Sequence, residues 1–169
     1  MGPIATGFGL ACWIVLGITF AGALLRTKGL QVFGISAFVF VMFWGSMAAS
    51  EQMPPPFSMS HYAVQDAALI AMIWWTWGPR PHVWRIAVVS LLLLQLGFHA
   101  VYWGLYGAGA TDLGTIRTYI LCNNIAFAGI LLALAFRGAG HVLAGLDDLF
   151  DGSDLTWGRD MVRAQGLPG

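Results

Sequence analysis

Residues 85–107, RIAVVSLLLLQLGFHAVYWGLYG, form a long apolar run that carries an amide, Gln95, and an imidazole, His99, in its interior. A helix of about 20 apolar residues can cross the hydrocarbon core of a bilayer, because it satisfies its backbone polar groups within itself. The run therefore predicts a transmembrane helix. Polar side chains are costly at that depth, so we expect Gln95 and His99 to face the interior of a helix bundle.

The whole chain shares this apolar character. Its 169 residues are 58% hydrophobic and only 9% charged, whereas roughly a quarter of the residues are charged in soluble domains. Eight Lys and Arg residues balance eight Asp and Glu residues, which does not favour nucleic acid as a partner. We expect an integral membrane protein of the bacterial inner (cytoplasmic) membrane, surrounded by the lipid bilayer.

Five segments are long and apolar enough to predict an all-α protein with five transmembrane helices. Short connections between them make each helix an antiparallel neighbour of the previous one, as in an up-down bundle. Three consecutive prolines, Pro54 to Pro56, end the second segment, because proline cannot continue a helix. The predicted five-helix domain is residues 1–137, with spans near 4–25, 30–50, 60–78, 85–107 and 117–136.

The basic residues predict how this domain is oriented. Lys and Arg in short loops mark the cytoplasmic side, and only Arg117 lies on the other side of the predicted topology. The N-terminus is therefore expected outside and the C-terminus in the cytoplasm.

In the remaining residues, 138–169, apolar side chains recur at helical spacing from Val142 to Phe150. They predict an amphipathic helix on the inner membrane surface, followed by a polar tail.

This topology brings polar side chains of the second to fifth segments to the outer half of the bundle. His61 and Gln65 are four residues apart, and so are Gln95 and His99, so each pair shares a helix face. Asp66 lies about 100° around the helix from Gln65. If these faces meet, they enclose a polar pocket. The candidate ligand- or proton-binding residues are Glu51, His61, Gln65, Asp66, Gln95, His99, Tyr102, Arg117, Asn123 and Asn124.

Structural roles explain several of these residues equally well. Glu51, His61 and Arg117 fall close to the predicted water interface, where polar residues are common. Asn123 and Asn124 could join helices through hydrogen bonds. The small-residue pairs Gly7/Ala11 and Gly45/Ala49 predict close helix packing, either within the bundle or between copies.

The predicted function is an outward-facing intramembrane pocket that binds a small ligand, an ion or a proton. Histidine titrates near neutral pH, so Asp66 and His99 could exchange a proton. One alternative is an accessory or assembly subunit, as a homo-oligomer or in a larger membrane complex. Another is a redox subunit, with haem b between His61 and His99 or with a quinol site. No nucleophile elbow, HExxH motif or P-loop is present, and no catalytic residue is predicted.

Overall fold

The computed structural model describes residues 3–50, 57–76 and 82–164, and within them all regular structure is helical. Side chains are described for residues 6–48, 61–76 and 82–149. The elements are α1 (Pro3–Leu25), the short 3-10 helix η1 (Thr27–Gly29), α2 (Leu30–Ser50), α3 (Phe57–Trp75), α4 (Val83–Gly107) and α5 (Leu113–Ala164).

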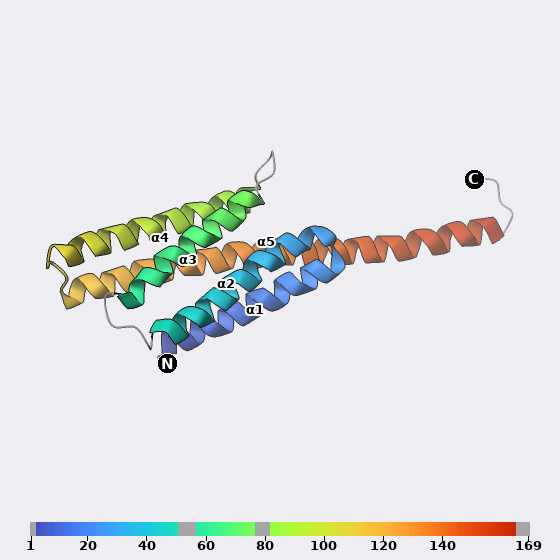
Figure 1. Ribbon diagram of the computed structural model, residues 1–169. Coiled ribbons are helices and arrows are strands. Elements are labelled where there is room, and N and C mark those ends of the chain that lie inside the picture. Colours follow the sequence, from blue (N-terminus) through green and yellow to red (C-terminus); the bar gives the residue numbers. More distant parts are fainter. Residues whose placement is uncertain (1–2, 51–56, 77–81, 165–169) are drawn as a thin grey trace.

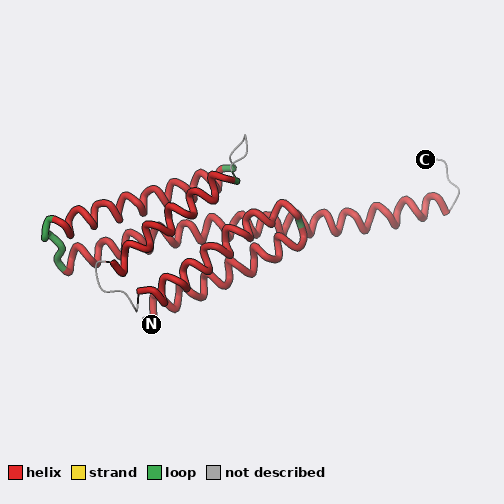
Figure 2. The backbone as a smooth tube through the Cα atoms, viewed as in Figure 1, coloured by secondary structure: helices red, strands yellow, loops and turns green. Residues whose placement is uncertain are grey.

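The five long helices run alternately in opposite directions, as Figure 1 shows. Helix α3 packs against α2 and α4, and α5 lies along both α4 and α1. Figure 2 shows that the connection at η1 and the connection between α4 and α5 are short. The up-down order therefore follows from the short connections, as the sequence predicts.

In the described part of the chain, four helical segments are long and apolar enough to cross a membrane, and they are Thr6–Leu25, Thr27–Ala48, Val83–Gly107 and Leu113–Leu149. Helix α3 has 19 residues and coincides closely with the predicted third span. Its crossing of the membrane stays a prediction, as does the orientation of the chain. The predicted proline turn at residues 54–56 lies outside the described residues.

Helix α5 differs from the sequence-based expectation. It runs for 52 residues without a break, and Figure 1 shows its second part leaving the bundle as a single helix. A separate surface helix beginning at residue 138 was expected. The physical reason for the difference is packing against α1. The rings of Phe8 and Phe127 are 5.5 Å apart, and Gly145 lies against Leu25, so α1 supports α5 on both sides of residue 138.

Small residues allow the backbones of α1 and α5 to approach closely. A Cβ added at Gly138 would lie 2.7 Å from Cγ2 of Thr19, and one at Gly22 would lie 3.0 Å from the Gly138 carbonyl oxygen. The glycines predicted to pack in this way are different ones. Nothing lies within 4 Å of a Cβ added at Gly7 or Gly45, so neither mediates helix contact within the bundle.

The turn between α4 and α5 determines where α5 starts. Gly109 has φ +69°, in the left-handed region that favours glycine. The Gly109 amide donates to the Tyr106 carbonyl, and the Ala110 amide donates to the Leu105 carbonyl, which is the hydrogen-bond pattern of a Schellman motif. Asp112 then caps α5, because its Oδ1 accepts from the Thr115 amide at 2.7 Å. The turn brings the polar residues of α5 alongside those of α4.

Candidate functional site

Helices α2, α3, α4 and α5 enclose a cavity of about 460 Å³. Most of its wall is apolar, with Phe38, Phe43, Leu69 and Leu92 among the lining residues. The polar lining residues come from all four helices. They are Ser46, Tyr62, Gln65, Asp66, Gln95, His99, Tyr119, Asn123 and Asn124.

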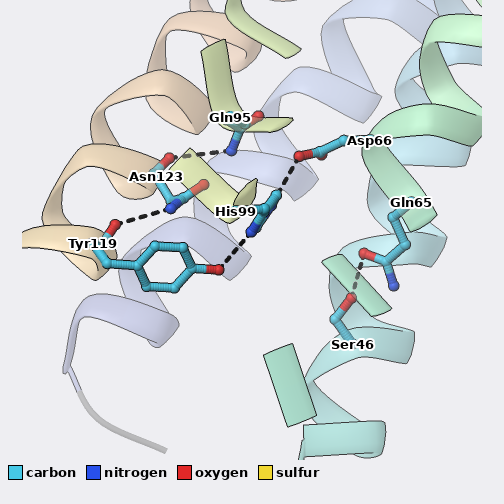
Figure 3. Close-up of polar contacts among 7 residues, drawn as sticks. All are labelled: Ser46, Gln65, Asp66, Gln95, His99, Tyr119 and Asn123. Carbon is cyan, nitrogen blue, oxygen red and sulfur yellow. Dashed lines mark hydrogen bonds and ion pairs between the residues drawn. The ribbon is translucent and has the colours of Figure 1, made fainter. Parts of the chain in front are cut away.

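His99 joins three helices through its two ring nitrogens (Figure 3). Its Nε2 lies 3.2 Å from Oδ2 of Asp66 on α3, and its Nδ1 lies 2.6 Å from the hydroxyl of Tyr119 on α5. The His99 side chain is only 5% exposed and that of Asp66 15%. The pair is thus almost entirely removed from solvent, and each ring nitrogen has a partner.

Hydrogen-bonding capacity limits how protons are arranged in this cluster. In a neutral His99 with its proton on Nε2, the ring donates to the Asp66 carboxylate and accepts at Nδ1 from the Tyr119 hydroxyl. In a protonated His99, both nitrogens donate. Both forms of the ring therefore find partners with the helices in the same positions.

Gln95 and Asn123 form a second polar contact one turn away from His99. Nε2 of Gln95 donates to the Asn123 carbonyl oxygen at 3.3 Å, and Nδ2 of Asn123 donates to the Tyr119 carbonyl oxygen at 2.9 Å (Figure 3). Their side-chain oxygens, Gln95 Oε1 and Asn123 Oδ1, are buried without a hydrogen-bond partner among the described residues. Both residues line the cavity. Two of the residues that line the cavity therefore carry a buried acceptor without a donor among the described residues.

The contact between α2 and α3 is separate from the His99 cluster. The Ser46 hydroxyl lies 2.6 Å from Gln65 Oε1 and also 2.6 Å from the Met42 carbonyl oxygen, so its one proton is shared between two acceptors. Gln65 and Asp66 differ by about 100° around α3. This difference explains why Gln65 contacts α2 while Asp66 contacts α4 (Figure 3).

The structure brings six of the ten predicted site residues to one cavity, namely Gln65, Asp66, Gln95, His99, Asn123 and Asn124. Three others do not line it. Tyr102 is buried and stacks on Tyr119 with ring centroids 4.4 Å apart. His61 is half-buried with its ring 4.2 Å from that of Tyr62. Arg117 is exposed near the beginning of α5, and Glu51 lies outside the described residues.

Tyr119 and Ser46 belong to the site but are absent from the predicted set. Tyr119 lies four residues before Asn123, and this spacing places both on one face of α5. That spacing could have identified it. Ser46 has a weaker signal, because a serine in an apolar helix more often bonds to its own backbone. Ser36 does so, at 2.9 Å from the Val32 carbonyl oxygen.

The geometry does not fit haem ligated by His61 and His99. Both nitrogens of His99 already have protein partners, and His61 does not line the cavity. A bis-histidine site would need one free ring nitrogen on each imidazole, with the two nitrogens facing one another. Among the described residues, no group of three or more His, Cys, Asp or Glu side chains is placed to hold a metal ion.

The chain matches no protein-family model, no curated protein and no solved structure. Its function is therefore inferred from its own residues. Chemically, the site combines a largely apolar space with a row of hydrogen-bonding groups on α3, α4 and α5, among them two acceptors without a donor.

Proposed function

We propose that this polytopic membrane protein binds a small, largely apolar molecule in the cavity between α2, α3, α4 and α5. The molecule carries a hydroxyl or amino group that donates to the cavity wall. Ligand pockets have volumes of about 300–1,000 Å³, mostly apolar walls and a few polar groups, and a cavity of about 460 Å³ falls within that range.

The observation that carries the proposal is the pair of unused acceptors, Gln95 Oε1 and Asn123 Oδ1. A buried polar atom without a partner costs about 1–3 kcal/mol, so native proteins rarely leave one unsatisfied. Gln95 is only 6% exposed, and both residues lie on the cavity wall. A donor group on a bound molecule would satisfy these atoms, while the apolar part of the molecule would contact Phe43 and Leu92.

The predicted topology adds a direction to this proposal. The cavity-lining residues of α4 are Leu92, Gln95 and His99, in the middle of the helix, and the polar residue His99 is the one nearest the turn to α5. That turn faces outside in the predicted orientation. The ligand would then enter from the outer side or from the outer leaflet.

The proposal is tested with a matched pair of probes, 4-butylphenol and butylbenzene, which differ by one hydroxyl group. The purified protein is titrated in a neutral detergent, and the unfolding temperature and heat of binding are measured. The phenol should bind at least about tenfold more tightly, since a satisfied hydrogen bond in a dry site contributes about 1–2 kcal/mol.

Two variants control for partition into the detergent. Val39 is buried and lines the cavity, and Val39→Phe fills it. Val101 is 61% exposed on α4, so Val101→Phe changes only the outer surface. Val101→Phe should bind the phenol as the unmodified protein does, whereas Val39→Phe should not. Equal binding by the two variants, or equal binding of the two probes, would contradict the proposal.

Association with copies or with a larger membrane complex stays a second prediction. Large apolar side chains are exposed along the outer faces of the helices, as at Leu10, Trp13, Leu93 and Leu132. Lipid covers such faces as well as another subunit does, so they favour neither role.

A further inference from the structure

The end of the bundle opposite the turn between α4 and α5 collects positive charge. There η1 and the first turn of α4 lie against α5, and the end of α3 lies against α4. We call this region the basic end. Its cationic and titratable residues are Arg26, Lys28, His82, Arg85, Arg137 and His141.

Arg85 is buried at the basic end without a negatively charged partner among the described residues. It is only 4% exposed, and arginine keeps its charge in proteins. One of its terminal nitrogens donates to the Thr76 carbonyl oxygen and the other donates to Oε1 of Gln31, and both acceptors are neutral. Its Nε is buried without a partner among the described residues. The ring of Trp84, with its centroid 5.4 Å from the guanidinium carbon, is the other compensating group.

Further cationic groups lie around Arg85 and add to the imbalance. Helices α4 and α5 run antiparallel with Leu91 against Gly129, so Arg137 of α5 lies near the level of Arg85. The Nε of Arg137 is buried without a partner in the described part of the chain. His141 is 5% exposed, with its Nε2 unpartnered in the same way. His141 is near Arg137, and it is also near Arg26 and Lys28 at η1.

Acidic residues do not balance these charges. Among the described residues of this end, the carboxylates belong to Asp147 and Asp148 on α5, and both are exposed. Asp148 pairs with Arg26 at 2.9 Å. No described carboxylate therefore pairs with Arg85 or Arg137. For buried Arg85 this is strongly unfavourable, because its charge is uncompensated.

We infer that the basic end binds a phosphate-type anion between Arg85 and Arg137, with His141 as a further contact. Guanidinium groups are the preferred partners of phosphate, because their N–H groups match its oxygens in pairs. Basic sites between transmembrane helices on the cytoplasmic side commonly hold the headgroups of acidic lipids. A phospholipid headgroup is one source of this anion and free phosphate is the other. This inference does not depend on the cavity ligand.

The test uses the full chain, stripped of lipid in a neutral detergent. Native mass spectrometry and unfolding temperature are measured with phosphatidylglycerol, with phosphatidylcholine and with inorganic phosphate. Phosphatidylglycerol should bind at least about fivefold more tightly than phosphatidylcholine, as expected from the attraction of one or more basic residues near a membrane. If inorganic phosphate stabilises the protein as much as phosphatidylglycerol does, the site binds free phosphate as well as a lipid headgroup.

Variants connect binding to the proposed residues. Arg137→Gln should weaken phosphatidylglycerol binding about fivefold or more, and so should Arg85→Gln. Arg117→Gln is the matched control, because Arg117 is exposed at the opposite end, and it should bind as the unmodified protein does. Should Arg85→Gln fail to fold, Arg137→Gln decides the outcome.

The inference is overturned by either of two results. One is that phosphatidylcholine and phosphatidylglycerol bind equally well while phosphate has no effect. The other is that Arg137→Gln retains the anion affinity of the unmodified protein.

Discussion

Near the cavity His99 has a partner at each ring nitrogen, whereas at the basic end the described hydrogen-bond acceptors of Arg85 are neutral. In the first region a carboxylate, an imidazole and a phenol from three helices satisfy one another. In the second, buried Arg85 lies near half-buried Arg137, and the described carboxylate that is paired there belongs to the exposed Asp148. A polar cluster that is complete needs no solute to be stable. At the basic end, the proposed anion would supply the missing negative charge.

The largest expected effect comes from breaking the complete cluster at its centre. His99→Ala removes the contacts to Asp66 and Tyr119 and leaves Asp66 buried without a partner. We expect the free energy of unfolding to fall by about 3 kcal/mol, as for other buried pairs that lose one member. Reversible unfolding in detergent measures the change.

The matched control for His99→Ala is His82→Ala. His82 is exposed at the N-cap of α4 and makes no capping hydrogen bond, so its removal should leave stability nearly unchanged. If the two variants lose equal stability, the three-helix cluster does not hold the bundle together, and the contrast between the two ends disappears.

The second prediction concerns how the basic end is held together. There the close approach of α1 and α5, rather than polar contacts, should supply the stability. Gly138→Ala places a Cβ 2.7 Å from Thr19 Cγ2, and we expect a loss of about 1–3 kcal/mol from overpacking.

Gly140→Ala is its control on the same helix. Nothing lies within 4 Å of a Cβ at that position, and alanine is the better helix former, so the variant should be neutral or gain up to about 1 kcal/mol. Thermal unfolding of both variants provides the comparison. If Gly138→Ala leaves the unfolding temperature unchanged, α1 and α5 are farther apart at this position than the distance above implies.

A smaller effect separates hydrogen bonds between helices from those within one helix. Ser46→Ala removes the contact between α2 and α3, and we expect a loss of about 0.6–1 kcal/mol. Ser36→Ala removes a hydroxyl that bonds only within α2, and it should change the free energy of unfolding by less than about 0.5 kcal/mol. Equal losses would mean that the Ser46–Gln65 contact contributes nothing between helices.

The smallest effect is expected at exposed Asp112, which caps α5 beyond the cavity. Hydrogen bonds from the Thr115 hydroxyl and amide lower the pKa of Asp112. Because the folded-state pKa lies below the unfolded value, the charged cap stabilises the fold above the ordinary aspartate range, and this contribution is lost as the pH falls through the folded-state pKa.

Asp112→Asn keeps an oxygen acceptor without the charge. Its unfolding temperature should fall slightly below that of the unmodified protein at about pH 6 and approach it at about pH 3, across the range in which aspartate titrates. A difference that grows as the pH falls would contradict the assignment of the cap.

Sequence reasoning located the cavity cluster because a polar residue inside an apolar run has few places to go. Gln65, Asp66, Gln95 and His99 all lie in such runs, and the spacing of four residues places two of them on one face of α4. The pairing of His99 with Tyr119 was harder to predict. Tyrosine is common at membrane interfaces, so its presence near a helix end carries little information about a partner.

The basic end was not predicted, because burial there depends on how helix ends cover one another. Arg85 starts the apolar run and looks like an interface residue, yet Gln31 and Thr76 approach it from two other helices. His141 follows the sequence GAG after Arg137, and glycines in that position favour the end of a helix. Here Gly138 instead permits contact with α1, and α5 continues.

The central claim is that polar side chains of separate helices meet around one cavity. A double-mutant cycle of Asp66→Asn and His99→Gln, measured by reversible unfolding, tests it most directly. The account predicts a coupling energy of about 1–2 kcal/mol between the two positions. The account is contradicted if the stability losses of the two single variants sum to the loss of the double variant within about 0.5 kcal/mol. That result would show that Asp66 and His99 do not interact.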